Sequence, residues 1–320
     1  MKTFNELLSE TTEDLRLAGV PEPDLNAWYL MAWSVALSHE DSDDRADEVD
    51  FVLRISESMP DRSWLLLHGS DETSEKITST LSTLVEHRKK RVPLEYITHI
   101  TEFMGLPIYV DPSVLIPRQD TECVVETALD IMKKEYSEKG ADVLDLCTGS
   151  GCIAISLAKL GKAKSVTATD KSAEAIGVAK KNAGLNDVNV RFLQGDMWGA
   201  LTGKENIGRL DADETEAPKF DLIISNPPYI RHDVMPELME EVRDYEPVMA
   251  LDGGEDGLLF YRSIVARVGT FLRKGGSLIF EIGYDQGEAV AGLMREAGLV
   301  DIEVKKDYAG CDRVVSARLI

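Results

Sequence analysis

The sequence predicts an α/β protein in which a small N-terminal helical domain precedes a doubly wound, mostly parallel sheet. Apolar residues recur at helical spacing through residues 1–90, which carry few strand signals. From about residue 119, apolar strands alternate with helical segments. The length of 320 residues also suits two domains better than one. We therefore expect a helical domain over 1–90, a linker over 91–118 and a sheet domain over 119–320.

Four helices are expected in the first domain. They fall at residues 1–17, from 21–24 onward, at 51–59 and at 76–90. The acidic run 39–50 is interpreted as a loop or an exposed helix start. This domain holds no ligand motif, so it serves either as scaffold or dimer contact, or as the part that recognises a macromolecular partner.

Residues 102–112 combine β-favouring side chains with turn signals, which predicts a hairpin in the linker. A helix is then expected to begin near 120–122, where Asp120 and Glu122 complement the helix dipole. Seven strands are expected in the sheet domain, at 142–146, 164–169, 189–194, 220–225, 276–282, 300–306 and 312–319. The polar stretch 199–219 is interpreted as a flexible surface insertion.

The net charge of −22 argues against a protein that grips duplex DNA or long RNA, because such proteins carry a basic face. The dense basic run 87–91 is interpreted as a solvated helix end. No segment reaches the ~20 apolar residues of a membrane span, and no signal peptide is apparent. The four cysteines form no C-x-x-C pair and the five histidines are scattered. We expect no metal site, no disulfides and a cytoplasmic location.

The most informative motif is Asn226-Pro227-Pro228-Tyr229, which follows an apolar strand at 220–224. Two prolines stiffen this loop and remove two N–H donors, so its backbone carbonyls are offered as acceptors. The Asn side chain adds another acceptor, and the Tyr adds a flat aromatic face. Such a loop suits a planar NH2 group on an sp2 carbon, as in adenine, cytosine, guanine or the carboxamide of glutamine.

A second motif is a glycine turn between a strand and a helix. Gly149 and Gly151 let the backbone approach a ligand, and the helix start presents free N–H groups. Asp170 ends the next strand, where a carboxylate can accept from both ribose hydroxyls of a nucleotide-like ligand. The spacing also fits a dinucleotide site. Asp145 ahead of the glycines, where it can hold a methionine amino group, and the Asn-Pro-Pro-Tyr loop favour S-adenosylmethionine over NAD.

Together these segments resemble the HemK/PrmC family of protein-(glutamine-N5) methyltransferases. The resemblance covers essentially the whole chain. It rests on Pro117-Arg118-Gln119-Asp120-Thr121-Glu122, residues 144–151, 226–230, 245–258, 281–283 and 307–314. The Asn-Pro-Pro-Tyr motif is shared with adenine and guanine methyltransferases, whereas the segment at 117–122 is much more specific.

The resemblance implies a class I S-adenosylmethionine-dependent methyltransferase domain behind a helical domain and a hairpin linker. It implies methylation of the glutamine in the Gly-Gly-Gln motif of peptide chain release factors. The implied cofactor-binding residues are Asp145, Cys147, Thr148, Gly149, Ser150, Gly151, Asp170, Asp196, Met197 and Asn226. Cys147 stands where many members have glycine. Either Met197 or its neighbour Trp198 covers the adenine.

The expected chemistry is positioning of a weak nucleophile. The Asn226 side-chain oxygen and the Pro227 carbonyl accept from the two N–H bonds of the glutamine amide, and Tyr229 packs on the amide plane. Asn226, Pro227 and Tyr229 are thus the catalytic residues, and Pro228 and Arg118 join them in binding substrate. Arg118 contacts a neighbouring carboxylate or the substrate backbone, or else forms an ion pair with Asp120 or Glu122.

Two other functions compete with this one. A nucleic-acid N-methyltransferase acting on adenine or guanine has the same site chemistry, but the net charge and the lack of a nucleic-acid-binding module weigh against it. A non-catalytic interaction protein that retains the fold is disfavoured by the intact Asp145, Gly149, Gly151 and Asp170.

Overall fold

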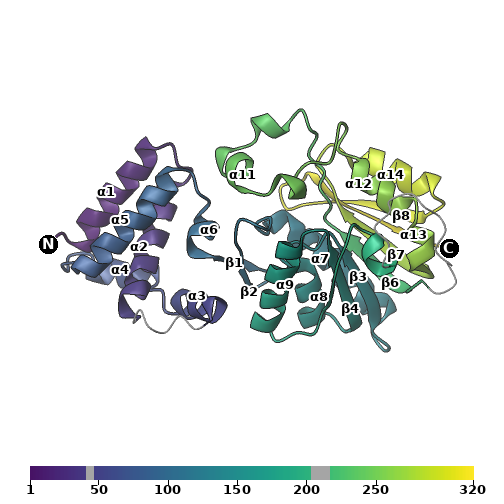
Figure 1. Cartoon of the computed structure of the whole chain (residues 1–320), viewed down its shortest axis with the longest axis horizontal. Helices are drawn as coiled ribbons and strands as arrows, with labels where there is room; N and C mark the ends of the chain where they lie inside the picture. Colours follow the sequence, from purple (N-terminus) through teal and green to yellow (C-terminus); the bar gives the residue numbers. More distant parts are fainter. Residues whose placement is uncertain (41–46, 203–216) are drawn as a thin grey trace. The chain divides into compact units, whose positions relative to one another are not determined.

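The computed structural model describes residues 1–40, 47–202 and 217–320. It forms two compact units, which are described separately (Figure 1). The helical unit comprises Met1–Ile100 and Met239–Tyr245, and the sheet unit comprises Thr101–Leu238 and Glu246–Ile320. Among the described residues, no helix has both the length and the apolar character needed to cross a bilayer.

The helical unit is built from seven helices among its described residues. They are α1 (Phe4–Leu17), α2 (Pro23–His39), α3 (Glu48–Glu57), α4 (Arg62–His68), α5 (Glu75–Lys89), α6 (Leu94–Thr98) and α11 (Glu240–Tyr245). Side-chain caps start several of them: Thr3 forms a capping box with Glu6, and Asp47, Asp61 and Ser74 accept from the first-turn N–H groups of α3, α4 and α5. The four predicted helices are present. The short helices α4 and α6 were not predicted. Half of the acidic run 39–50, residues 41–46, lies outside the described residues, and α3 begins at Glu48 in the described part.

The basic run at the end of α5 is only partly the solvated helix end that the sequence predicts, because His87 and Lys90 are exposed whereas Arg88 is buried. Arg88 is 4% exposed and donates to Asn26 Oδ1 at 2.7 Å and to Glu241 Oε1 at 3.1 Å. Arg91 also donates to Glu241, at 2.7 and 2.6 Å. The sequence could not indicate the buried contacts of Arg88 and Arg91, because their partner Glu241 lies 150 or more residues away. Two of the five basic residues therefore hold α11 in the helical unit.

The predicted hairpin is confirmed as a two-stranded sheet of β1 (Ile100–Phe103) and β2 (Leu106–Tyr109). Met104 and Gly105 both have positive φ, the geometry of a tight two-residue turn that follows strand twist. The buried Asn182 fixes β2 to the sheet unit, because its amide exchanges hydrogen bonds with the Tyr109 backbone at 2.7 and 2.9 Å. The same amide donates to the carbonyl of Ser150 in the glycine turn at 2.9 Å.

The sheet unit contains a seven-stranded sheet of order β5-β4-β3-β6-β7-β9-β8, in which β9 runs antiparallel to the other six strands. The strands are β3 (Ala141–Leu146), β4 (Ala163–Asp170), β5 (Arg191–Gln194), β6 (Phe220–Ser225), β7 (Leu272–Glu281), β8 (Val300–Lys306) and β9 (Asp312–Arg318). All seven predicted strands are present, and β7 begins four residues before its predicted start. This confirms the class I methyltransferase architecture expected from the sequence.

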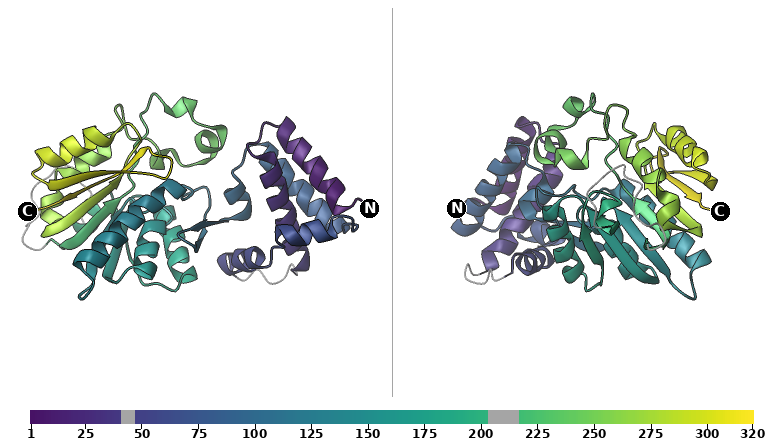
Figure 2. Two further views of the ribbon diagram at one scale, coloured as in Figure 1. Left: turned by 180° about the vertical axis from the view of Figure 1, so that it is seen from behind. Right: turned by 45° about the vertical axis from the view of Figure 1, so that its right-hand side comes forward.

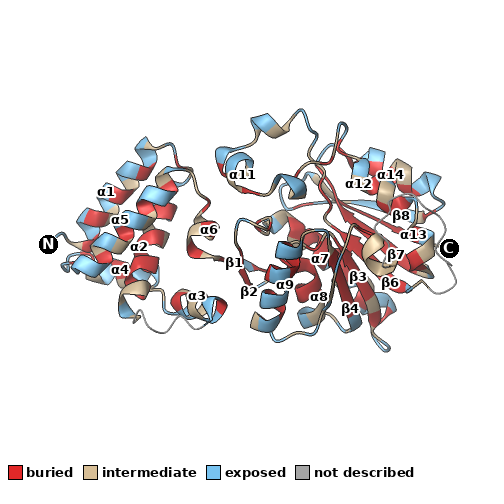
Figure 3. Cartoon of the chain, in the orientation of Figure 1, coloured by how far each residue is buried: buried red, intermediate tan, exposed pale blue. Residues whose placement is uncertain are grey.

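Helices cover both faces of this sheet (Figures 1 and 2). One face carries α7 (Gln119–Glu135), α8 (Cys152–Leu160) and α9 (Ala173–Leu185), and the other carries α12 (Leu259–Val265), α13 (Val268–Phe271) and α14 (Gly287–Glu296). Two 3-10 turns (Met235–Glu237 and Val248–Ala250) and α10 (Gly199–Thr202) complete the described elements. Most of the predicted insertion 199–219 lies outside the described residues. The central strands are buried nearly throughout (Figure 3).

The strand order reverses between β3 and β6, and this reversal creates a crevice at the carboxyl ends of the strands. Leu146 at the end of β3 pairs with Thr169 on β4 and with Ser225 on β6. The Ser225 hydroxyl donates to the Leu146 carbonyl at 2.7 Å, which joins the two central strand ends. The glycine turn and the Asn-Pro-Pro-Tyr loop therefore leave the sheet side by side.

Candidate active site

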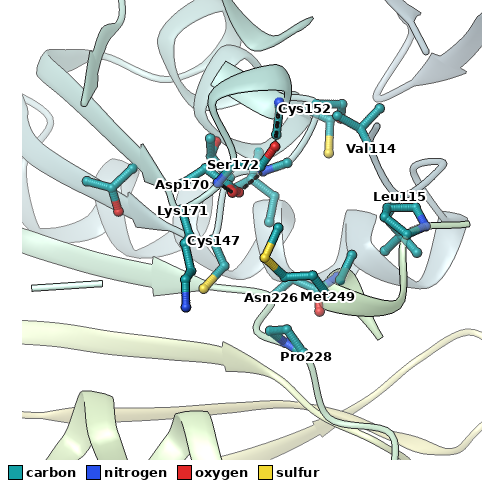
Figure 4. Close-up of a pocket in the computed structure, with 18 of the residues that line it drawn as sticks. Val114, Leu115, Cys147, Cys152, Asp170, Lys171, Ser172, Asn226, Pro228 and Met249 are labelled. Carbon is teal, nitrogen blue, oxygen red and sulfur yellow. Dashed lines mark hydrogen bonds between the residues drawn. The ribbon is translucent and has the colours of Figure 1, made fainter. Parts of the chain in front are cut away.

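A cavity opens at this reversal point and brings together segments that are far apart in the sequence (Figure 4). Of the predicted site residues, nine line it: Cys147, Thr148, Gly149, Ser150, Asp170, Asp196, Met197, Asn226 and Pro228. Asp170 and Asn226 thus border one cavity although they leave different strands. The predicted residues Asp145, Gly151, Pro227, Tyr229 and Arg118 do not line it.

The glycine turn owes its shape to left-handed backbone at three positions. Cys147, Gly149 and Gly151 have φ of +60°, +54° and +84°. A Cβ on Gly151 would lie 3.0 Å from the Cβ of Ala179, so glycine there also permits close packing against α9. Gly151 caps the N-terminus of α8, which places free N–H groups of the helix start beside the cavity.

Asp145 lies beneath the turn and is fully buried. Its Oδ2 accepts from the Thr148 hydroxyl at 2.5 Å, while Oδ1 has no hydrogen-bond partner among the described residues. Burial raises the pKa of Asp145 to about 7, and the charge of Asp170 adds to the effect against the opposing Thr148 hydrogen bond. A buried carboxylate with one unsatisfied oxygen is costly, and a cationic ligand group would offset that cost.

Asp170 holds the far side of the turn. Its Oδ2 accepts from the Gly149 N–H and its Oδ1 from the Ser172 N–H, both at 2.9 Å. Burial raises the pKa of Asp170, although these backbone hydrogen bonds oppose the shift. Each oxygen has a second lone pair, so the carboxylate can still accept from ligand hydroxyls. Asp196, which also lines the cavity, pairs with Lys171 at 3.1 Å.

The structure separates Met197 from Trp198, which the sequence left as alternatives. Met197 lines the cavity. Trp198 is 3% exposed, stacks on Phe271 with ring centroids 4.4 Å apart, and donates its Nε1–H to the Ser263 carbonyl at 3.2 Å. Trp198 is therefore a core residue, and Met197 is the one available to a ligand.

The Tyr229 ring does not lie at the cavity, where the sequence analysis expects it to pack on a substrate amide. Its side chain packs against the core of the sheet unit and its hydroxyl donates to Glu281 Oε1 at 3.3 Å. Its carbonyl accepts from Gln286 Nε2 at 3.0 Å. Pro227 is likewise buried away from the cavity lining. The loop thus presents Asn226 and Pro228 to the cavity, whereas Tyr229 anchors it to the sheet unit.

Two glycines explain part of the motif at 245–258. A Cβ on Gly253 would lie 2.7 Å from the Cα of Tyr229, and one on Gly257 would lie 2.4 Å from the Tyr229 carbonyl oxygen. Backbone hydrogen bonds link Ile230 to Leu251 and Gly253 at 3.0 and 2.7 Å. This segment therefore packs directly on the backbone of the Asn-Pro-Pro-Tyr loop.

Arg118 forms an ion pair with the nearly buried Glu246 and has no ion pair with Asp120 or Glu122. Asp120 instead pairs with Arg313 at 3.1 Å, and Glu122 accepts from the Met104 N–H at 2.6 Å. The expectation of a neighbouring carboxylate is met, and the alternative ion pair is wrong. The neighbours Pro117 and Pro247 both line the cavity, so this pair joins two parts of its wall.

Sequence reasoning missed several lining residues, notably Ser113, Val114, Leu115, Thr121, Met249 and Phe260. Thr121 lies in the motif at 117–122 and Met249 in the motif at 245–258, but neither residue type indicates a role in ligand binding there. The Ser113–Leu115 stretch follows the hairpin and carries no ligand signature that the sequence could display. Asn182, which ties the hairpin to the glycine turn, reads as an ordinary helix residue in the sequence.

Comparison with known proteins adds four findings. A family model for a methyltransferase small domain matches residues 125–243, and a model for the PrmC N-terminal domain matches residues 59–98. The release factor glutamine methyltransferase of Clostridium acetobutylicum is 42% identical over 259 residues, covering 80% of this chain and 86% of that protein. The protein of the same name from Agrobacterium fabrum is 35% identical over 319 residues, covering 99% of this chain and 97% of its own.

Proposed function

The chain belongs to the release factor glutamine methyltransferase family, and from that premise we propose that it methylates the side-chain amide nitrogen of the glutamine in the Gly-Gly-Gln motif of peptide chain release factors. The methyl donor is S-adenosylmethionine. One observation carries the proposal: a single cavity is bordered by the glycine turn with Asp170 and by Asn226 with Pro228. The first group suits the donor, and the second suits a planar amide.

The residues around the glycine turn fit the donor. We assign Asp170 to the ribose hydroxyls, Met197 and Asp196 to the adenine, and the turn itself to the methionine part. Asp145 is assigned to the amino group, because its buried Oδ1 has no partner among the described residues and would gain one. When bound, S-adenosylmethionine supplies a methyl group activated by a positively charged sulfur.

The protein's own contribution is to orient the amide. An amide nitrogen is a weak nucleophile because its lone pair is delocalised into the carbonyl. We propose that Asn226 Oδ1 accepts one N–H of the substrate amide and that a loop carbonyl, assigned to Pro227, accepts the other. Positioning of this kind in a site without water can lower the activation free energy by ~7–11 kcal/mol. Tyr229 is assigned to anchoring the loop.

Release factor recognition requires more surface than a glutamine side chain offers. Specific interfaces bury about 800 Å² per partner. We propose that the helical unit and the hairpin supply this area, and that Arg118 braces the cavity wall through Glu246. We also propose a cytoplasmic protein that neither binds nucleic acid stably nor associates with membranes, since a net charge of −22 opposes both phosphate-rich surfaces.

The test compares two candidate substrates in separate incubations. The protein is incubated with methyl-labelled S-adenosylmethionine and either an intact release factor or total RNA from the same source. We expect label in the release factor only. Label in RNA with none in the release factor would favour the nucleic-acid methyltransferase that shares this site chemistry.

A further inference from the structure

The two ends of the Asn-Pro-Pro-Tyr loop are held by different parts of the sheet unit. Its first residue, Asn226, follows directly on Ser225, whose hydroxyl joins β6 to β3. Asn226 and Pro228 border the cavity (Figure 4). The two prolines of the loop carry no N–H groups, so they cannot donate the backbone hydrogen bonds that hold other loops in place. The geometry of the loop therefore depends on what holds its far end, at Tyr229.

Gln286 holds that far end through its side-chain amide. It lies in the turn between β7 and α14, is 8% exposed and does not line the cavity. Its Nε2 donates to the Tyr229 carbonyl at 3.0 Å and to the Gly257 carbonyl at 3.3 Å. Both N–H bonds of the amide are thus used, each on a backbone oxygen of a different segment. One buried side chain therefore joins the loop to the segment that packs on it.

The oxygen end of the same amide determines which way the NH2 group faces. Gln286 Oε1 accepts from the Gly283 N–H at 2.9 Å and from the hydroxyl of the buried Tyr261 at 3.5 Å. The Gln286 N–H in turn donates to the Gly283 carbonyl at 3.0 Å. If the amide were turned over, its oxygen would face two carbonyl oxygens and its NH2 would face the Gly283 N–H. The donors are therefore held toward Tyr229 and Gly257.

Glycine at position 257 gives this junction the room that it needs. A Cβ there would lie 2.4 Å from the Tyr229 carbonyl oxygen and 2.6 Å from Gln286 Nε2, and the φ of +72° also favours glycine. Gly257 belongs to the motif at 245–258, and Gly283 belongs to the motif at 281–283. Neither glycine lines the cavity. The junction at Gln286 gives both a common purpose, which is to fix the end of the loop.

We propose that Gln286 is a positioning residue for methyl transfer. By holding the Tyr229 carbonyl, it keeps Asn226 and the Pro227 carbonyl where they meet the substrate amide. The inference rests on the proposed function, in which these two acceptors orient the glutamine. Gln286 acts through the loop and does not touch the substrate, since it does not line the cavity. A displacement of about 1 Å at a reacting group can lower the rate ~100-fold, so loss of this anchor should appear in kcat.

The experiment measures kcat and KM for a release factor at saturating S-adenosylmethionine, the Kd for S-adenosylmethionine, and the thermal midpoint of unfolding. Gln286→Glu keeps the shape but turns a carboxylate oxygen toward two carbonyls, and Gln286→Met keeps the length but removes both donors. Each should lower kcat ~10- to 100-fold and leave KM within about threefold. The Kd should stay within about twofold, because Asp170 and the glycine turn follow β4 and β3, whereas Gln286 holds a loop after β6.

Tyr261→Phe is the matched control. The Tyr261 hydroxyl donates to Gln286 Oε1 and to the Glu281 carbonyl at 2.8 Å, both on the β7 side of the junction. Its loss should lower the thermal midpoint but leave the kcat of the folded enzyme within about threefold of wild type. Gly257→Ala tests the junction from its other side, because the new methyl group would push on the Tyr229 carbonyl. It should show the same fall in kcat with little change in Kd.

The outcomes separate positioning from a general effect on the fold. An active wild type whose kcat is unchanged in folded Gln286→Glu or Gln286→Met would overturn the inference and leave the proposed function intact. An equal fall in kcat in Tyr261→Phe would also overturn it, because the cause would then be a loosened core. If neither Gln286 variant folds, the kinetics of Gly257→Ala decide in the same way. A wild type that methylates no release factor would overturn both proposals together.

Discussion

Gly149 donates its backbone N–H to the carboxylate of Asp170 at 2.9 Å, so the turn that follows β3 is held by the residue that ends β4. Asp170 therefore supports the turn, in addition to the ribose-binding role that we propose for it. Any substitution there tests both at once.

Asp170→Ala should weaken S-adenosylmethionine binding by roughly 1.5–3 kcal/mol, because charge-assisted hydrogen bonds are lost. Binding of the demethylated product should weaken in parallel, since both share the ribose. Isothermal titration calorimetry measures both affinities. Asp170→Asn, which keeps one acceptor oxygen, should lose less. Unchanged affinity for both ligands would mean that the ribose is held elsewhere.

Asp145→Asn should bind S-adenosylmethionine less tightly than wild type but should be the more stable protein at high pH. The pKa of Asp145 is raised to about 7 in the folded state, so between about pH 4 and about pH 7 the folded protein binds a proton that the unfolded chain has released. Stability of the wild type therefore falls as pH rises through this window, by on the order of 4 kcal/mol. Asp145→Asn has no carboxyl to titrate at this position, so it lacks this fall in stability.

Urea unfolding without cofactor, at about pH 5 and about pH 8, measures the difference. We expect Asp145→Asn to be more stable than wild type at the higher pH and to lose that advantage at the lower one. Equal stabilities at both values would show that the carboxyl titrates normally.

Cys147 occupies left-handed backbone with φ of +60°, a conformation that glycine adopts without strain. Cys147→Gly should remove strain of roughly 1–2 kcal/mol and give back part of it through the greater freedom of the unfolded chain. Cys147→Ala keeps a Cβ and serves as control. Glycine should be the more stable variant in thermal unfolding by about 1 kcal/mol. A more stable alanine variant would contradict this account of the turn.

Glu241→Ala should destabilise the helical unit by about 3 kcal/mol, because it leaves the buried Arg88 charge without its carboxylate. Glu240→Ala is the matched control: Glu240 is half exposed and contacts only Arg91 among the described ion pairs, so its loss should cost less than about 1 kcal/mol. Chemical denaturation compares the two. Similar small losses would mean that the buried pair contributes nothing net.

Local patterns in the sequence were sufficient for the elements but not for the long-range partners. Alternating apolar runs and helical periodicity located every strand and the hairpin, because both depend on nearby residues. They missed α4 and α6, whose seven and five residues are too short to establish a period.

In the site, the residues that border the donor side were predictable because glycines and strand-end acids have recognisable spacing. The orientation of Tyr229 was not, because it depends on Glu281, which is 52 residues away and buried. The same holds for Arg118, whose partner Glu246 is 128 residues distant, and for Arg88, whose partner is 153 residues distant. Charge pairing across such separations follows from the fold and leaves no local pattern.

The central claim is that Asn226 presents an acceptor to the amide nitrogen of the Gly-Gly-Gln glutamine. The most direct test is mass spectrometry of that peptide from an intact release factor treated with S-adenosylmethionine and either wild type or Asn226→Ala. The account predicts one methyl group on the glutamine with wild type. It also predicts a rate at least ~100-fold lower with Asn226→Ala at saturating substrates, with little change in cofactor affinity. Near wild-type turnover by Asn226→Ala, or methylation on a residue other than that glutamine, would contradict it.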